Sequence, residues 1–215
     1  MLALRASPVT LVTCLVTCQG STLERMRKSS VLLALSLAVL LPAFVQGEDA
    51  PPRITNDFVQ QQFGKDFTLV PEIGVLVGDL DGDGVEDAVI AARCRNPLLD
   101  EAEYNYTVLD PYYSFYGYGN PKVTMSFGDD NPARRGLVVL IIHGAGSEAW
   151  RAAKPKAKFV IINLPYRALS VRKMRLGKKT VQAVYTEERN EEHETSAMFF
   201  DGKKYKYVPM GSSME

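Results

Sequence analysis

The chain has 215 residues, 46% of them hydrophobic and 23% charged, which is an ordinary composition for a globular protein. Its 25 Lys and Arg residues balance 25 Asp and Glu residues. No charge of one sign dominates, which argues against a nucleic-acid partner.

The segment 26–47 has the three parts of a secretory signal peptide. Arg27 and Lys28 form a basic start, Val31–Phe44 an apolar centre, and Val45-Gln46-Gly47 a cleavage site with a small residue. The preceding residues 1–25 are interpreted as an over-extended start, the alternative being a long, unusual leader. The apolar centre is about 14 residues long, whereas a spanning helix needs roughly 20, so we expect no retained membrane span. A retained anchor is the alternative.

A signal peptide predicts that the protein is exported, so we expect it to be secreted, periplasmic or on the cell surface. Cys14 and Cys18 lie in the leader, and Cys94 is then the lone remaining cysteine, which cannot form an internal disulfide. Because Cys94 follows the apolar run "AVIAAR", we expect it to be a buried small hydrophobic residue.

We expect a tail and one short helix over residues 48–66. A single β domain is expected over residues 67–215. In "TNDFVQQQFG", Thr55 or Asn56 is the candidate N-cap and Gly64 the candidate end. The runs 73–77 and 87–93 that follow are rich in the β-branched residues that strands prefer.

Residues 95–133 form a long excursion rich in Tyr, Gly, Pro and Asn, with short strands expected near 104–109 and 122–127. Its aromatic residues either pack the segment onto its own domain or form a binding surface. They are Tyr112, Tyr113, Phe115, Tyr116 and Tyr118.

Further strands are expected at 137–143, 157–164 and 179–188, with a short helix around 148–153. Near the carboxyl end, Asp201-Gly202 between two strand-like runs predicts a two-residue hairpin turn. The fold class is therefore mainly β: about seven antiparallel, hairpin-linked strands with one or two short helices.

The stretch "VGDLDGDGVEDAVI", residues 77–90, has the spacing of a calcium loop. Calcium takes six to eight oxygen ligands, so a site needs several carboxylates on a sharply turning backbone, here allowed by Gly82 and Gly84. The candidate ligands are the side chains of Asp79, Asp81, Asp83 and Asp87 and the carbonyl of Val85. The alternative is an acidic hairpin turn without a metal.

An EF-hand requires Glu at the twelfth position of the loop, where this chain has Ile90, and it requires flanking helices rather than strands. The loop instead resembles the calcium loop of FG-GAP/VCBS repeats, the units of integrin-α-type propellers, over about residues 70–94. That resemblance implies a structural Ca²⁺ in a loop that joins two strands. Only one copy is present, so we do not expect a full propeller.

The segment "HGAG" after the strand at 137–143 is similar to the oxyanion loop of α/β-hydrolases, with His143, Gly144 and Gly146 in place. No Gly-x-Ser-x-Gly follows it, so we expect His143 to be a strand-end histidine with a backbone partner.

Together these features predict an exported, calcium-stabilised β domain that is non-enzymatic and serves binding, adhesion or envelope recognition. Its partner would be a protein or an envelope or glycan ligand. The alternative is a small envelope-associated enzyme, hydrolase-like around His143, or an enzyme inhibitor.

Overall fold

The computed structural model describes residues 54–123, 132, 135–188 and 194–210. All of them belong to one compact unit, Glu48–Glu215. The expected start at 1–25, the signal peptide at 26–47 and most of the tail lie outside the described residues. Among the described helices, none has both the length and the apolar character needed to cross a membrane.

The described residues form ten strands and three short helices. Their order along the chain is α1 (Asn56–Phe63), β1 (Phe67–Leu69), β2 (Val75–Gly78), β3 (Asp87–Cys94), β4 (Thr107–Leu109), α2 (Pro111–Phe115), β5 (Leu137–His143), η2 (Gly146–Arg151), β6 (Ala157–Ile161), β7 (Ala168–Leu176), β8 (Lys179–Glu187), β9 (Ser196–Phe200) and β10 (Tyr205–Pro209).

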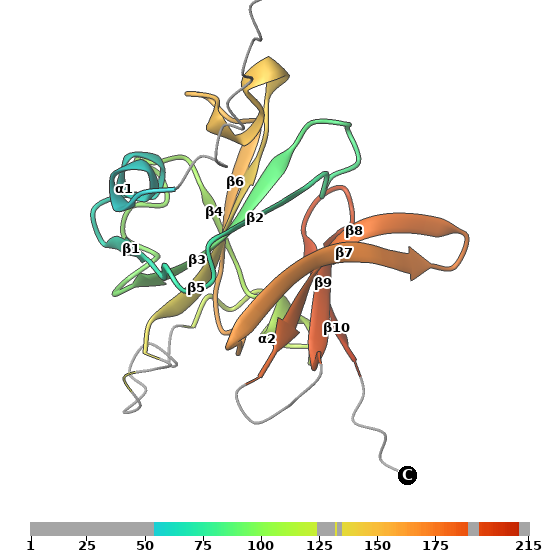
Figure 1. The fold of residues 1–215 in the computed structure, drawn as a ribbon. Coiled ribbons are helices and arrows are strands. Elements are labelled where there is room, and N and C mark those ends of the chain that lie inside the picture. The colour runs from blue at the N-terminus through green and yellow to red at the C-terminus, as the bar shows by residue number, and fades with distance from the viewer. Residues whose placement is uncertain (1–53, 124–131, 133–134, 189–193, 211–215) are drawn as a thin grey trace, which may run out of the picture. The chain divides into compact units, whose positions relative to one another are not determined.

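The strands make two sheets (Figure 1). The six-stranded sheet has the order β1-β3-β5-β6-β4, with β2 also paired to β3. Strand β2 pairs with the first half of β3, from Gly78↔Asp87 to Val75↔Ile90, and β1 pairs with its second half. The four-stranded sheet is an antiparallel meander, β10-β9-β8-β7. All pairs are antiparallel except β4 with β6.

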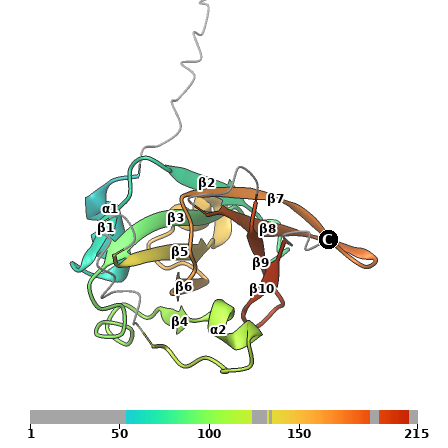
Figure 2. The same cartoon turned by 90° about the horizontal axis from the view of Figure 1, so that it is seen from below.

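The central strands β3 and β5 of the six-stranded sheet are buried on both faces. On β3, Ala88, Ile90 and Ala92 face the core that α1 covers, whereas Val89 and Ala91 face the core shared with the four-stranded sheet. Figure 2 shows α1 and the four-stranded sheet on opposite sides of this central sheet. Successive side chains of a strand point to opposite faces, so a strand covered on both sides reads as a continuous apolar run.

Helix α1 begins and ends where its sequence predicts. The Thr55 hydroxyl accepts a hydrogen bond from the Phe58 amide at 3.2 Å, and Gly64 ends the helix with a φ of 110°. Val59 and Phe63 then lie fully buried on the central sheet.

The mainly β fold class is confirmed, without a closed propeller. Ten strands replace about seven: β1 and the long strand β7 are added, and β4 is the short strand expected near 104–109. The last hairpin differs from the expected two-residue turn. Phe200 pairs with Tyr205, so the loop has four residues, and the Asp201 carboxylate accepts from the amides of Lys203 and Lys204.

The excursion at 95–133 contains regular structure, namely β4 and α2. The Asp110 carboxylate caps α2 by accepting from the Tyr113 amide at 3.0 Å. The second short strand, expected at 122–127, falls mostly outside the described residues. Buried Cys94 and Trp150 both contribute to the core under α1.

Candidate metal site at the loop between β2 and β3

The acidic loop joins two antiparallel strands, β2 and β3, and the pair Gly78↔Asp87 closes it. Gly82 and Gly84 have φ values of 79° and 84°, a left-handed conformation that side chains other than glycine rarely adopt. Nothing lies within 4 Å of a Cβ placed at either position, so the backbone turn alone requires these glycines.

The aspartates of the loop hold its backbone. The Asp79 carboxylate accepts from the amides of Gly82 at 2.8 Å and Gly84 at 3.0 Å. Asp81 accepts from the Asp83 amide at 3.2 Å, and Asp83 accepts from the Val85 amide at 2.8 Å. Short side chains that bond to amides two to five residues further on stabilise a tight turn.

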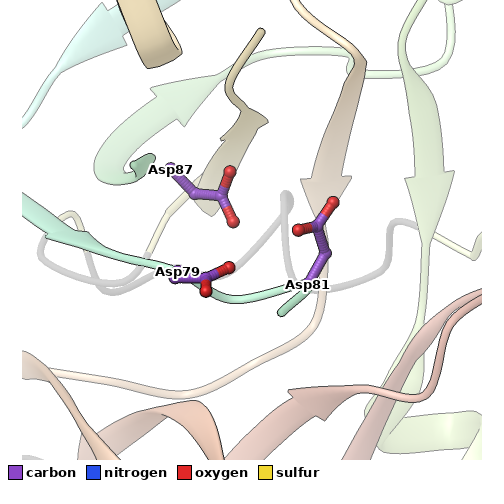
Figure 3. A group of neighbouring side chains, drawn as sticks. All are labelled: Asp79, Asp81 and Asp87. Carbon is purple, nitrogen blue, oxygen red and sulfur yellow. The ribbon is translucent and has the colours of Figure 1, made fainter. Parts of the chain in front are cut away.

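Three of the expected ligands come together. Asp79, Asp81 and Asp87 each offer one carboxylate oxygen, and these oxygens lie within 4.8 Å of one another. Figure 3 shows the three side chains converging from the loop and from the start of β3. Carboxylate oxygens suit hard cations such as Ca²⁺, Mg²⁺ and Mn²⁺, so this cluster could hold a metal ion.

Asp87 is the buried member of the cluster, with 1% of its surface exposed. One of its oxygens accepts from the Leu80 amide and the other from the Gly144 amide, both at 2.8 Å. Burial raises the pKa of this carboxyl to about 6, although the two amide bonds work in the opposite direction. Through its bonds to the Leu80 and Gly144 amides, Asp87 connects the loop to the end of β5.

Asp83 is not part of this carboxylate cluster, and the Val85 carbonyl stays a predicted ligand. The outer oxygen of Asp83 accepts from the Lys156 ammonium at 2.7 Å, and this bond holds the pKa of Asp83 below its usual value. Val85 enters the loop's bonding through its amide.

Lys156, which lies 75 residues from Asp81, also donates to the Asp81 carboxylate at 2.7 Å. Its bonds to Asp81 and Asp83 raise the pKa of this lysine. Nothing in the local sequence around Lys156 points to this role.

His143 ends β5 and is buried beneath the loop, with 1% of its surface exposed. Its Nδ1 lies 3.4 Å from the Asp81 carboxylate, and its Nε2 lies 2.7 Å from the Tyr205 hydroxyl. A neutral ring with its hydrogen on Nδ1 satisfies both contacts. Burial lowers the pKa of His143 despite the nearby carboxylate of Asp81, which favours this neutral form.

The expectation of a backbone partner for the His143 ring was therefore wrong. The ring bonds to side chains, and it packs between Phe159 and Phe200, with ring centroids 5.1 and 4.8 Å away. The sequence pattern identified neither Tyr205 nor its contact with His143.

The "HGAG" segment is used in packing. The Gly144 amide, which an oxyanion loop would turn toward a substrate, donates instead to Asp87. A Cβ at Gly144 would lie 2.4 Å from the Glu86 carbonyl oxygen and 2.8 Å from the Ala149 carbonyl carbon. This geometry does not favour hydrolase chemistry around His143.

A cleft of about 250 Å³ lies between the acidic loop and the four-stranded sheet. Asp79 and Asp81 line one side, and Lys173, Gln182 and Phe200 are among the residues on the other. The cleft therefore borders the cluster at Asp79 and Asp81, whereas Asp87 is buried.

Some aromatic residues of the excursion pack against the domain and others are exposed to solvent. Tyr112 packs on Tyr207 of β10, with ring centroids 5.3 Å apart, and Tyr113 stacks edge-on against Tyr112. Phe115, Tyr116 and Tyr118 are exposed, at 49%, 55% and 70%. We call these three residues the aromatic patch.

Comparison with known proteins found no matching family model, no similar curated protein and no similar solved structure. What the site does has to be inferred from its own geometry.

Proposed function

We propose that this chain is an exported, non-enzymatic binding domain in which one Ca²⁺ fixes the loop between β2 and β3. The observation that carries the proposal is the convergence of the Asp79, Asp81 and Asp87 oxygens within 4.8 Å. The β-loop-β setting supports it, because the loop sequence resembles the FG-GAP/VCBS calcium loop, which also joins two strands.

The metal acts on the fold. Without a metal ion, the Lys156 ammonium offsets only part of the negative charge of the loop, and the remaining repulsion between its carboxylates opposes the closed turn. Calcium that binds only the folded state adds stability in proportion to RT ln(1 + [Ca²⁺]/Kd). Ca²⁺ is favoured over Mg²⁺ because a loop with carboxylate and backbone oxygens matches its flexible coordination, whereas Mg²⁺ demands near-octahedral geometry.

The partner-binding role is assigned to the aromatic patch. Exposed aromatic rings are typical of recognition surfaces for proteins and for glycans, since they offer large rigid contact area. A protein or an envelope glycan is the proposed ligand class.

Thermal melting of the purified protein tests the calcium proposal. With 10 mM Ca²⁺ and a Kd of about 10⁻⁴ to 10⁻³ M, the gain is roughly 1.4 to 2.7 kcal/mol over chelator. For a chain of this size, that gain raises the melting temperature by about 3 to 10 °C. Mg²⁺ at the same concentration should give a smaller rise.

The matched variants are Asp79→Ala, which removes a member of the cluster, and Glu103→Ala, which removes an exposed acid elsewhere. Asp79→Ala should abolish the calcium shift and Glu103→Ala should keep it. Equal melting temperatures of the unmodified protein in calcium and in chelator would overturn the metal proposal.

A further inference from the structure

The pairing of β5 with β6 in the central sheet positions Lys156 next to the acidic loop. It directly precedes β6, its amide donates to the His143 carbonyl at 3.0 Å, and the next residue, Ala157, pairs with His143 in the β5–β6 ladder. The same strand end that places His143 beneath the loop thus fixes the backbone from which the lysine side chain reaches over it.

The ammonium group lies between two loop carboxylates. Its distances to the Asp81 and Asp83 oxygens are both 2.7 Å, which are short, charge-assisted hydrogen bonds. The Asp81 side chain is 4% exposed, whereas that of Lys156 is 50% exposed. Asp81 is therefore held in place, while the lysine can turn its flexible stem outward without disturbing the core.

We propose that Lys156 is a built-in counter-ion, which offsets part of the negative charge of the loop in the metal-free protein and which Ca²⁺ must displace on binding. This inference rests on the proposed metal site. A divalent ion bound by Asp81 brings two positive charges next to the ammonium, and like charges at such short range repel. Binding therefore exchanges the lysine for the metal.

Two consequences follow from this exchange. Repulsion in the metal-free loop is reduced, because the ammonium group offsets part of the negative charge at Asp81 and Asp83. The affinity for calcium is also lowered, because the bonds from Lys156 to Asp81 and Asp83 must break first. The site then responds only where calcium is abundant.

Calorimetric titration of the full chain with CaCl₂ tests the inference, using Lys156→Met and the matched control Lys154→Met. Both substitutions remove one exposed ammonium group near the start of β6, but only Lys156 contacts the loop. Lys156→Met should tighten the apparent Kd about three- to tenfold, and Lys154→Met should change it less than twofold.

A second measurement reads the exchange in the unmodified protein. Calcium should increase the rate at which the Lys156 amine reacts with an acylating reagent, followed by mass spectrometry, and should leave the rate at Lys154 unchanged. If Lys156→Met is poorly folded in chelator, this labelling result decides the question, and an unchanged rate at Lys156 overturns the inference.

The outcomes separate the two proposals. If the unmodified protein binds calcium and Lys156→Met binds it no more tightly, the counter-ion inference fails and the metal site stands. If only Lys156→Met binds calcium, the inference holds and the proposed function of the natural chain fails. If neither binds, both are overturned.

Discussion

Asp87 accepts hydrogen bonds from two backbone amides that lie 7 and 57 positions away in the sequence. The loop spacing identifies this residue as a ninth-position metal ligand, but the structure also makes it the acceptor that joins the loop to the end of β5. A buried carboxylate that satisfies two buried amides contributes to stability with or without a metal. The contribution of Asp87 to the free energy of unfolding can therefore be measured in the absence of calcium.

Asp87→Ala leaves the Leu80 and Gly144 amides without their acceptor, and we expect it to lower the free energy of unfolding by about 2 to 4 kcal/mol. Urea denaturation in chelator measures this loss apart from any metal. Asp87→Asn keeps one acceptor oxygen and should lose less, while Glu103→Ala should stay within about 0.5 kcal/mol. A loss below 1 kcal/mol for Asp87→Ala would contradict the bridging role.

At the scale of elements, three segments meet at Gly144: the end of β5, the acidic loop and η2. A Cβ there would lie 2.4 Å from the Glu86 carbonyl oxygen and 2.9 Å from the Trp150 amide nitrogen, and both are backbone atoms. Backbone atoms cannot move aside as the end of a side chain can. The glycine is therefore needed for the close approach of the segments that support the metal site.

Gly144→Ala should therefore cost about 2 to 3 kcal/mol, because the loop or η2 must shift to admit the methyl group. Gly146→Ala is the matched control: its φ of 61° is strained for alanine, but nothing lies within 4 Å of the added Cβ. That control should cost about 1 kcal/mol. Denaturation of both variants measures the difference, and equal losses would show that crowding at Gly144 is not decisive.

At the scale of the whole molecule, the two sheets share one core, and the aromatic segment lies at its edge. Tyr112 and Phe115 contact Tyr207 of β10, with ring centroids 5.3 and 5.4 Å apart. Tyr112 and one side of Phe115 thus take part in the packing between α2 and the four-stranded sheet. Phe115 is still 49% exposed, and Tyr116 and Tyr118 are more exposed.

This division predicts that stability and binding respond to different substitutions. Tyr112→Ala should lower the free energy of unfolding by about 2 to 3 kcal/mol, because it removes a half-buried ring from the packing. Tyr118→Ala should change stability by less than about 0.5 kcal/mol but reduce co-sedimentation of the protein with insoluble polysaccharides. If the unmodified protein does not co-sediment, the glycan ligand is contradicted.

Local patterns in the sequence were sufficient for several elements. Thr55 and Gly64 bound α1 because capping and a left-handed C-terminus are properties of adjacent residues. The apolar runs predicted β3 and β5, and the regular spacing of the acidic loop predicted that Asp79, Asp81 and Asp87 would lie together. The short strand β1 escaped prediction because three residues are too few to establish a period, whereas β4 lies within the short strand expected near 104–109.

The tertiary structure alone decided what surrounds the loop. Lys156, His143 and Gly144 contact it from the end of β5 and the start of β6, and Tyr205 of the other sheet contacts the His143 ring. Such contacts depend on which strands become neighbours, and spacing along the chain carries no signal for partners more than 50 residues apart. The sequence by itself thus determined a β domain with an acidic turn. The strand order determined that a lysine lies over this turn and a buried histidine beneath it.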